Sequence, residues 1–233
     1  MQPLFHSSKT RRSWQWLYTL VTFVVLAAGW KYPALGFFVL AAMTGGLISG
    51  LLAGRWFCGN LCPRGGFLER VLSKVSPGKP TPAWLKKPIV RIGFMVLLGT
   101  VLTVNISRNP TEWQQWGLAF WLVCLVTTLL GIVLAFFGNS RTWCNICPMG
   151  TLQNWTGGAR YSLAIDPVKC IKCKRCEKQC PMHLAIIDTT WETPQTIPSR
   201  DCIRCGECIA ACPTKTLHFV EANGNRCCKR ITH

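Results

Sequence analysis

Acidic residues are scarce in this chain. Its 233 residues include 26 Lys and Arg but only 9 Asp and Glu, which gives a formal net charge of +17. Charged residues of both signs amount to 15% of the chain and hydrophobic residues to 49%, a low share of charge for a soluble protein. A basic excess of this size is typical of proteins that bind nucleic acid, an acidic partner or the cytoplasmic face of a membrane. The positions of the basic residues, described below, favour the membrane and argue against nucleic acid.

Several cofactor motifs are also missing. None of the four His residues falls in an apolar stretch, so the chain offers no paired axial ligands for a haem within the membrane. No carboxylate lies in the middle of an apolar stretch, which argues against a proton pathway. There is no Gly-rich dinucleotide fingerprint and no phosphate-binding loop, so we expect no NAD and no hydride transfer from a nicotinamide. The four residues are His6, His183, His218 and His233.

Four apolar stretches of about 17–22 residues are each long enough to cross a bilayer. Lys and Arg gather in the N-terminal tail and between the second and third stretches, whereas the other two connections have only Lys31 and Arg108. Because basic residues mark cytoplasmic loops, both termini are predicted to be cytoplasmic. We expect no cleaved signal peptide, and we interpret Arg11-Arg12 as a basic anchor rather than a twin-arginine signal. The stretches are Trp14–Trp30, Ala34–Gly54, Pro88–Ser107 and Trp116–Phe137.

Cysteine, by contrast, is abundant, with fifteen residues. The run Cys170-x2-Cys173-x2-Cys176-x3-Cys180-Pro181 is repeated as Cys202-x2-Cys205-x2-Cys208-x3-Cys212-Pro213. This is the spacing of bacterial two-cluster ferredoxins, in which the fourth Cys of each run ligates the cluster of the other run. A pair of zinc sites is the alternative that such Cys pairs also allow. We therefore assign one [4Fe–4S] cluster to Cys170, Cys173, Cys176 and Cys212, and a second to Cys202, Cys205, Cys208 and Cys180.

These patterns predict a mainly α membrane protein with a small α+β domain appended. A basic cytoplasmic tail (1–13) precedes a four-helix transmembrane domain (14–160), built from two repeated hairpins. A ferredoxin-like domain with two [4Fe–4S] clusters follows (161–222), and a C-terminal tail (223–233) completes the sequence. Short hydrophobic runs at 162–166 and 216–220 are predicted to be strands of that domain, and 77–88 to be a loop.

Two further Cys-Pro motifs follow the predicted hairpins. They are Cys58-x3-Cys62-Pro63 and Cys144-x2-Cys147-Pro148. We hypothesise that these four Cys hold a third [4Fe–4S] cluster at the cytoplasmic membrane surface. A redox-active dithiol, transient metal binding, a separate cluster for each pair, and purely structural cysteines are the alternatives.

The residues around these motifs have simpler interpretations. Arg55 and Arg141 each lie three residues before the first Cys of a motif, where they either neutralise a nearby cluster or lipid or anchor a helix end. Cys124 lies within the fourth apolar stretch and is interpreted as a packing residue. Cys227 and Cys228 are expected to belong to a tail without a metal role.

With four predicted spans, two Cys-Pro motifs and a two-cluster module, the whole chain resembles the NapH-type membrane-bound polyferredoxins. These are quinol dehydrogenase membrane components related to NosR- and MauN-type proteins, and the resemblance implies a place in a bacterial inner membrane. The resemblance implies an electron-transfer subunit of an oxidoreductase complex, which relays electrons between the quinone pool or a cytoplasmic donor and partner redox subunits. The second Cys-Pro motif departs from the family's usual Cys-x3-Cys-Pro because it is one residue shorter.

The resemblance also implies a quinone site, for which the sequence offers two places. In the outer loop, Glu112 could accept quinol protons beside Trp113 or Trp116, although Trp at an interface is also an ordinary aromatic belt. A site beside Cys58–Pro63 at the inner leaflet lies nearer the predicted clusters. Two other functions stay open: a copper reductase or metal-assembly factor, and a membrane anchor whose clusters are structural.

Overall fold

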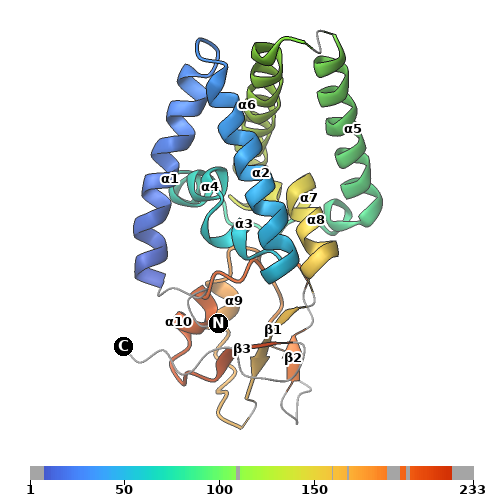
Figure 1. The fold of residues 1–233 in the computed structure, drawn as a ribbon. Helices are drawn as coiled ribbons and strands as arrows, with labels where there is room; N and C mark the ends of the chain where they lie inside the picture. Colours follow the sequence, from blue (N-terminus) through green and yellow to red (C-terminus); the bar gives the residue numbers. More distant parts are fainter. Residues whose placement is uncertain are drawn as a thin grey trace.

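Long helices occupy one end of the molecule, and a small sheet with short helices occupies the other (Figure 1). The computed structural model describes residues 8–108, 111–158, 160–166, 168–187, 195–197 and 200–221. The elements in chain order are α1 (Ser8–Ala28), α2 (Ala34–Ala53), α3 (Trp56–Asn60), α4 (Pro63–Arg70), the 3-10 helices η1 (Leu72–Lys74) and η2 (Ala83–Lys86), α5 (Pro88–Ser107), α6 (Trp113–Phe137), α7 (Thr142–Ile146), α8 (Pro148–Gly157), β1 (Tyr161–Ile165), α9 (Arg175–Lys178), β2 (Gln195–Ile197), α10 (Glu207–Ala211) and β3 (Leu217–Glu221).

Among the described residues, three helices are long and apolar enough to cross a membrane. They are α2, α5 and α6, with mean hydropathies of 2.0, 2.0 and 2.6. They correspond to the second, third and fourth predicted spans, except that α6 begins at Trp113 rather than Trp116. Most of their side chains face outward, which suits helices whose surroundings are lipid rather than water.

Helix α1 covers the first predicted span but is not one of these three. It begins at Ser8, well before Trp14, and its first turns carry basic residues that lower its hydropathy. One face of α1 is polar and buried, and its large apolar side chains point outward. This arrangement is the reverse of a soluble amphipathic helix, which buries its apolar face. The buried polar residues are Arg11, Gln15, Thr19 and Thr22.

Helices α2 and α6 approach each other closely because glycine lies on both. A Cβ atom added to Gly36 would lie 1.9 Å from the carbonyl oxygen of Gly117, and one added to Gly117 would lie 2.1 Å from the carbonyl oxygen of Pro33. Small residues are the usual means by which membrane helices bring their backbones together. The two halves of the helical part are therefore joined along these two helices.

The short helices that carry the Cys-Pro motifs lie between the long ones. Helix α4 packs against α1 and α6 and lies beside the middle of α1, and α8 packs against α2 and α5 (Figure 1). The predicted position of the Cys-Pro motifs at the cytoplasmic membrane surface stays a prediction. Both segments fold back into the helix bundle, because the Pro after each second Cys begins a helix that points inward among the spans.

The second module is built on a three-stranded antiparallel sheet with strand order β2-β1-β3. In the central strand β1, Leu163 pairs with Ile197 on one side and with Phe219 on the other. The predicted strands at 162–166 and 216–220 are confirmed, each shifted by one residue. Buried Leu163 and Phe219 turn towards the short helices α9 and α10, which carry the cysteines.

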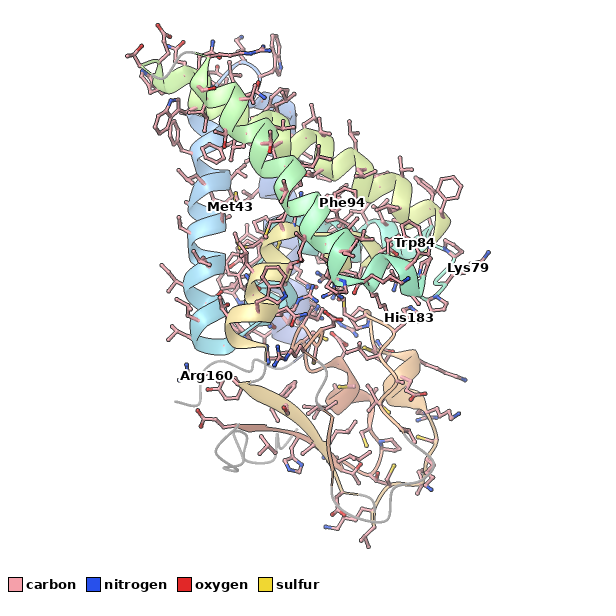
Figure 2. All side chains as sticks on the ribbon, turned by 90° about the vertical axis from the view of Figure 1, so that its right-hand side faces the viewer. Met43, Lys79, Trp84, Phe94, Arg160 and His183 are labelled. Atoms are coloured by element: carbon pink, nitrogen blue, oxygen red, sulfur yellow. The ribbon has the colours of Figure 1, made fainter. Side chains whose placement is uncertain are left out.

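The junction between the two parts includes the segment 71–87, which joins η1 to α5. Figure 2 shows Lys79 and Trp84 of this segment on the same side of the molecule as His183 of the sheet module. The side-chain amide of Asn139, just after α6, donates a 2.8 Å hydrogen bond to the carbonyl of Pro181. The predicted loop at 77–88 is mostly irregular, with one 3-10 helix, η2.

We predict that Gly36→Ala destabilises the protein, because the added methyl group meets the backbone of α6. Overpacking of this kind costs about 1–3 kcal/mol. The control is Gly99→Ala on α5, where nothing lies within 4 Å of the added Cβ. Thermal denaturation of the purified protein in detergent should show a lower Tm for the first variant and an unchanged or slightly raised Tm for the second. Equal Tm values for both variants would contradict the described packing of α2 on α6.

Candidate metal centres

Two cavities lie inside the sheet module, and together they account for all eight cysteines of the two long runs. The larger is lined by Cys180, Cys202, Cys205 and Cys208. The smaller is lined by Cys170, Cys173, Cys176 and Cys212. In each case the fourth Cys of one run lines the cavity of the other run. This grouping is the crossed one that the spacing predicts.

Backbone conformation explains how each loop wraps its cavity. The left-handed residues of the sheet module have φ angles between 48° and 76°. They include Lys172 and Lys174 in the first loop and Arg204 and Gly206 in the second. A left-handed residue on either side of a Cys keeps the chain curved around one point instead of extending it. The third Cys of each run then sits on a short helix, α9 or α10.

The chemistry of the cavity walls suits iron–sulfur clusters. Apart from the thiols, the larger cavity is lined by aliphatic, aromatic and methionine side chains and by one glycine. Burial raises the pKa of Cys176 to about 11 and that of Cys205 to about 12. Such thiols are protonated at neutral pH, so metal binding must displace their protons. Within the described ranges, no three His, Cys, Asp or Glu side chains converge closely enough to hold a single metal ion.

Cys212 has a different environment from the other ligands. Burial alone would raise its pKa, but hydrogen bonds with Thr216 and Thr214 outweigh that effect and lower the pKa to about 7. The sulfur lies 3.3 Å from the Thr216 hydroxyl and 3.5 Å from the Thr214 hydroxyl. The smaller cavity therefore has one wall that stabilises a thiolate.

The two Cys-Pro motifs are brought together by a reciprocal contact. The guanidinium of Arg141 donates a 3.0 Å hydrogen bond to the carbonyl of Cys58, and that of Arg55 donates to the carbonyl of Cys144. Each Arg thus binds the first Cys of the opposite motif. Both Arg side chains are fully buried, so neither serves as a helix-end anchor at the lipid surface.

Two glycines leave the space for this exchange. A Cβ atom at Gly65 would lie 2.7 Å from the guanidinium of Arg141, and one at Gly150 would lie 2.9 Å from that of Arg55. Each glycine is the third residue after the second Cys of its motif. The second motif is one residue shorter at the end of its first short helix. Leu61 lies between α3 and Cys62, whereas Cys147 directly follows α7. The two halves therefore remain equivalent around the cysteines.

Comparison with known proteins agrees with this arrangement. A family described as a 4Fe-4S dicluster domain matches residues 162–213, and one described as a 4Fe-4S binding domain matches twice, at 35–82 and 113–160. The ferredoxin-type protein NapH of Escherichia coli is 27% identical over 217 residues, which cover 83% of this chain and 70% of that protein. The chain is a NapH-like polyferredoxin.

Other relatives extend the comparison. An uncharacterised protein of Methanocaldococcus jannaschii is 28% identical over 177 residues, or 74% of this chain and 67% of that protein. One component of an ion-translocating oxidoreductase complex of Methanosarcina acetivorans is 43% identical over 56 residues, or 24% of this chain and 20% of that protein. No solved structure matches the chain. These comparisons support an iron–sulfur electron-transfer role for a membrane protein.

Most buried arginines of the polyferredoxin are paired with a few carboxylates. Glu69 on α4 binds Arg141 and lies 2.7 Å from Arg11 of α1. Burial alone would raise the pKa of Glu69, but these two guanidinium groups outweigh that effect and hold the pKa at about 2. Basic residues that the sequence assigned to the membrane surface, such as Arg11, are therefore internal counter-charges.

Two more carboxylates join the sheet module to the helices. Asp201 receives two 2.9 Å hydrogen bonds from Arg91 at the start of α5 and one of 3.1 Å from Arg55. Glu207 binds Arg11 at 2.7 Å and Arg12 at 2.8 Å. Sequence analysis missed both acidic residues, although each lies directly before a Cys ligand in a chain with few carboxylates.

Arg64 differs from these arginines. It has no carboxylate within ion-pair distance among the described residues. Its guanidinium contacts the hydroxyl of Thr127, the sulfur of Cys147 at 3.4 Å and the ring of Trp143, whose centroid is 5.2 Å away. Its counterpart in the second motif is Met149. One uncompensated cation therefore faces the Cys-Pro cysteines.

The remaining candidates lie away from these sites. Glu112 precedes α6 at the end of the helices opposite the sheet module, and its side chain is exposed and forms no cap (Figure 1). Trp113 and Trp116 are partly exposed at the same end. Cys124 is part of α6, and its carbonyl accepts a hydrogen bond from the hydroxyl of Thr128. Cys227 and Cys228 lie outside the described residues.

We predict that Glu69→Gln destabilises the polyferredoxin, because it leaves the buried guanidinium groups of Arg141 and Arg11 without a countercharge. Breaking a buried ion pair from one side costs about 3–5 kcal/mol. Glu112→Gln, the same change at an exposed position, is the matched control. The Tm of the purified protein should fall clearly for Glu69→Gln and stay unchanged for Glu112→Gln. A Glu69→Gln protein as stable as the wild type would show that this network contributes nothing to the fold.

Proposed function

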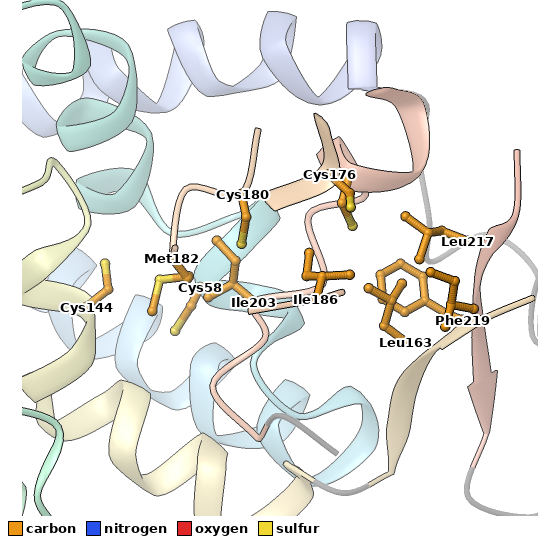
Figure 3. Packing of buried hydrophobic residues seen from close by; sticks show 12 residues of the cluster. Cys58, Cys144, Leu163, Cys176, Cys180, Met182, Ile186, Ile203, Leu217 and Phe219 are labelled. Carbon is orange, nitrogen blue, oxygen red and sulfur yellow. The ribbon is translucent and has the colours of Figure 1, made fainter. Parts of the chain in front are cut away.

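We propose that the chain is a membrane-bound iron–sulfur subunit that relays electrons between the quinone pool or a cytoplasmic donor and a partner redox protein. The observation that carries this proposal is the continuity of the cysteine sites. A continuous group of buried side chains extends from Cys58 and Cys144 through Met182 and Ile203 to the cysteines of the sheet module (Figure 3). The larger cavity lies next to the Cys-Pro motifs, and the smaller one lies beyond it.

The residues of each site have distinct tasks. The eight cysteines of the two long runs would hold two [4Fe–4S] clusters, which when bound carry single electrons. The apolar walls exclude water and thereby tune the reduction potentials. The cysteines of the larger cavity lie between the Cys-Pro cysteines and the cysteines of the smaller cavity. This order defines the path of the relay.

The four Cys-Pro cysteines would hold a third cluster within the helix bundle. The exchange of Arg55 and Arg141 fixes the two motifs against each other. Helices α4 and α8 both begin directly after the second Cys of a motif, so their N-terminal dipoles favour negative charge there. The backbone amide of Gly65 already donates to the sulfur of Cys62 at 3.4 Å.

We also propose that α1 is a fourth membrane span and that the sheet module is cytoplasmic. The outward-facing apolar side chains of α1 support a lipid environment, and its buried polar face meets partners inside the bundle. The helix connections nearest the sheet module carry most of the basic residues, as the positive-inside rule requires for a cytoplasmic side. A boundary near residue 161 is supported by family matches that end at 160 and begin at 162.

A quinone would bind near the Cys-Pro end of the bundle rather than at the outer loop. Glu112, Trp113 and Trp116 lie at the far end of the spans from every cysteine of the three sets (Figure 1). Electron transfer across that distance would need another carrier. The inner-leaflet position beside Cys58–Pro63 places a quinone next to the proposed relay.

We predict about twelve iron atoms per chain for three [4Fe–4S] clusters, against about eight for two. The double variant Cys58→Ser/Cys144→Ser should lose about four iron atoms and keep the absorption of the other two clusters. Cys124→Ser, on α6, should keep all twelve. Iron is measured on the purified protein, and redox titration follows the clusters. A wild-type count of eight would exclude the third cluster, and clusters that never change oxidation state would favour a structural anchor.

We predict that Arg64→Met lowers the midpoint potential of the Cys-Pro centre, because a nearby cation stabilises the added electron. A unit charge several ångströms away in a partly polar interior shifts the potential on the order of 100 mV. Met is the residue that the second motif has at this place. Arg64→Lys is the control, since it keeps the charge. Redox titration followed by electron paramagnetic resonance should show the shift in one signal and unchanged potentials for the two sheet-module centres; an unshifted signal would mean that Arg64 does not act on this centre.

A further inference from the structure

The two cysteine loops of the sheet module are copies of one motif, and their surroundings can be compared position by position. Aligning Cys170 with Cys202 places Lys172 opposite Arg204 and Lys174 opposite Gly206. The backbone is alike in both loops, with φ angles of 51° and 57° in the first and 53° and 76° in the second. Differences between the loops therefore lie in their side chains and not in their shape.

The second loop is a docking face that is already occupied. Its Ile203 is 1% exposed and its carbonyl lies 2.1 Å from where a Cβ on Gly59 would be. The guanidinium of Arg204 donates 2.8 Å hydrogen bonds to the carbonyls of Gly158 and Tyr161. Asp201 and Glu207 bind arginines of the helical part. Two carboxylates and one isoleucine thus attach this loop to the helices.

The same face of the first loop is open. Ile171, the counterpart of Ile203, is 64% exposed, and neighbouring Val168 is 88% exposed. The thiol residue Cys173 is also exposed, so the smaller cavity reaches the surface here. The segment between β1 and α9 lies at the end of the module away from the helices (Figure 1).

At two equivalent positions, the charges of the two loops are opposite. Lys169 stands where the second loop has Asp201, and Arg175 stands where it has Glu207. Lys174 stands where the second loop has Gly206, although its left-handed backbone favours glycine. The first loop thus has basic side chains at both positions where the second loop carries its docking carboxylates, and keeps a further lysine at a conformational cost.

We propose that this face, formed by residues 168–175, is the docking surface for a soluble acidic one-electron carrier. The carrier presents carboxylates to Lys169 and Arg175, as the helical part presents arginines to Asp201 and Glu207. An apolar centre, Ile171 and Val168, with a charged rim is the usual form of a small, transient redox interface. This inference rests on the proposed function, because it takes the centre behind the loop to be an iron–sulfur cluster.

The electron balance of the step is simple. With a reduced [2Fe–2S] ferredoxin as the carrier, one electron leaves its cluster and one is gained at the centre held by Cys170, Cys173, Cys176 and Cys212. No bond is formed or broken, and no proton is transferred. The reverse step, with the same stoichiometry, loads an oxidised carrier.

The test uses the full-length protein in detergent and a plant-type [2Fe–2S] ferredoxin, a small acidic carrier, as the probe. Its affinity is measured by titration calorimetry at several ionic strengths, and electron transfer is followed by stopped-flow absorption. Lys169→Asp/Arg175→Glu gives the first loop the residues of the second. Lys174→Gly removes one charge and keeps a residue that suits the backbone. Lys74→Glu/Lys79→Glu, at two exposed lysines of the segment 71–87, is the control with the same change in net charge.

We expect Lys169→Asp/Arg175→Glu to raise the Kd at low salt by about tenfold or more and to slow electron transfer by a similar factor. The Kd of this variant should also depend less on salt. Lys174→Gly should weaken binding by a smaller factor, and the control pair should leave it near the wild-type value. A wild-type protein that does not bind the probe, loop variants that bind as tightly as the wild type, or a control that weakens binding equally would each overturn the docking surface. Iron content separates the two proposals: a wild-type protein without iron–sulfur clusters refutes the proposed function, whereas a full complement with unchanged Kd refutes only this surface.

Discussion

The exchange of Arg55 and Arg141 between the two Cys-Pro motifs is the interaction on which the helical part depends. A buried guanidinium costs several kcal/mol unless its donors are satisfied. Each of these arginines meets a carbonyl of the opposite motif and a carboxylate, Asp201 for Arg55 and Glu69 for Arg141. Neither half can move without leaving a charge buried and unpaired. The two Cys-Pro motifs are therefore fixed against each other.

Because carboxylates are scarce, the same few acidic residues connect distant parts of the molecule through ion pairs. Glu69, Asp201 and Glu207 each bind at least two arginines. The arginines of Glu69 and of Asp201 come from separate parts of the chain, whereas Glu207 binds the neighbours Arg11 and Arg12. The single side chain of Arg11 binds both Glu69 of α4 and Glu207 of the sheet module, so it joins α1 to both. Sharing few anions among many cations makes the contacts interdependent, so the two parts of the molecule form one electrostatic unit. Arg64, which pairs with no carboxylate among the described residues, faces the Cys-Pro cysteines.

Sequence reasoning predicted the features that local spacing determines. The crossed grouping of the eight cysteines follows from the repeat of the run, and β1, β3, α2 and α5 follow from local hydrophobicity. It failed where burial is decided by distant partners. Arg11 lies 196 residues from Glu207, so its pairing has no local signal. The Pro of each Cys-Pro motif begins α4 and α8, but the helices that they pack against, α1, α2 and α5, are distant in the sequence and have no local signal there.

The attachment of the second cysteine loop also determines which part of the module stays accessible. The sheet module has two equivalent loops, each at the mouth of one cavity. The carboxylates Asp201 and Glu207 bind arginines of the helical part, so they fix the second loop against it and place the larger cavity beside Cys58 and Cys144. The pseudo-symmetry of the module then turns the first loop, with Cys173, towards solvent. A single set of ion pairs therefore orients the module with one cavity towards the membrane bundle and the other towards the solution.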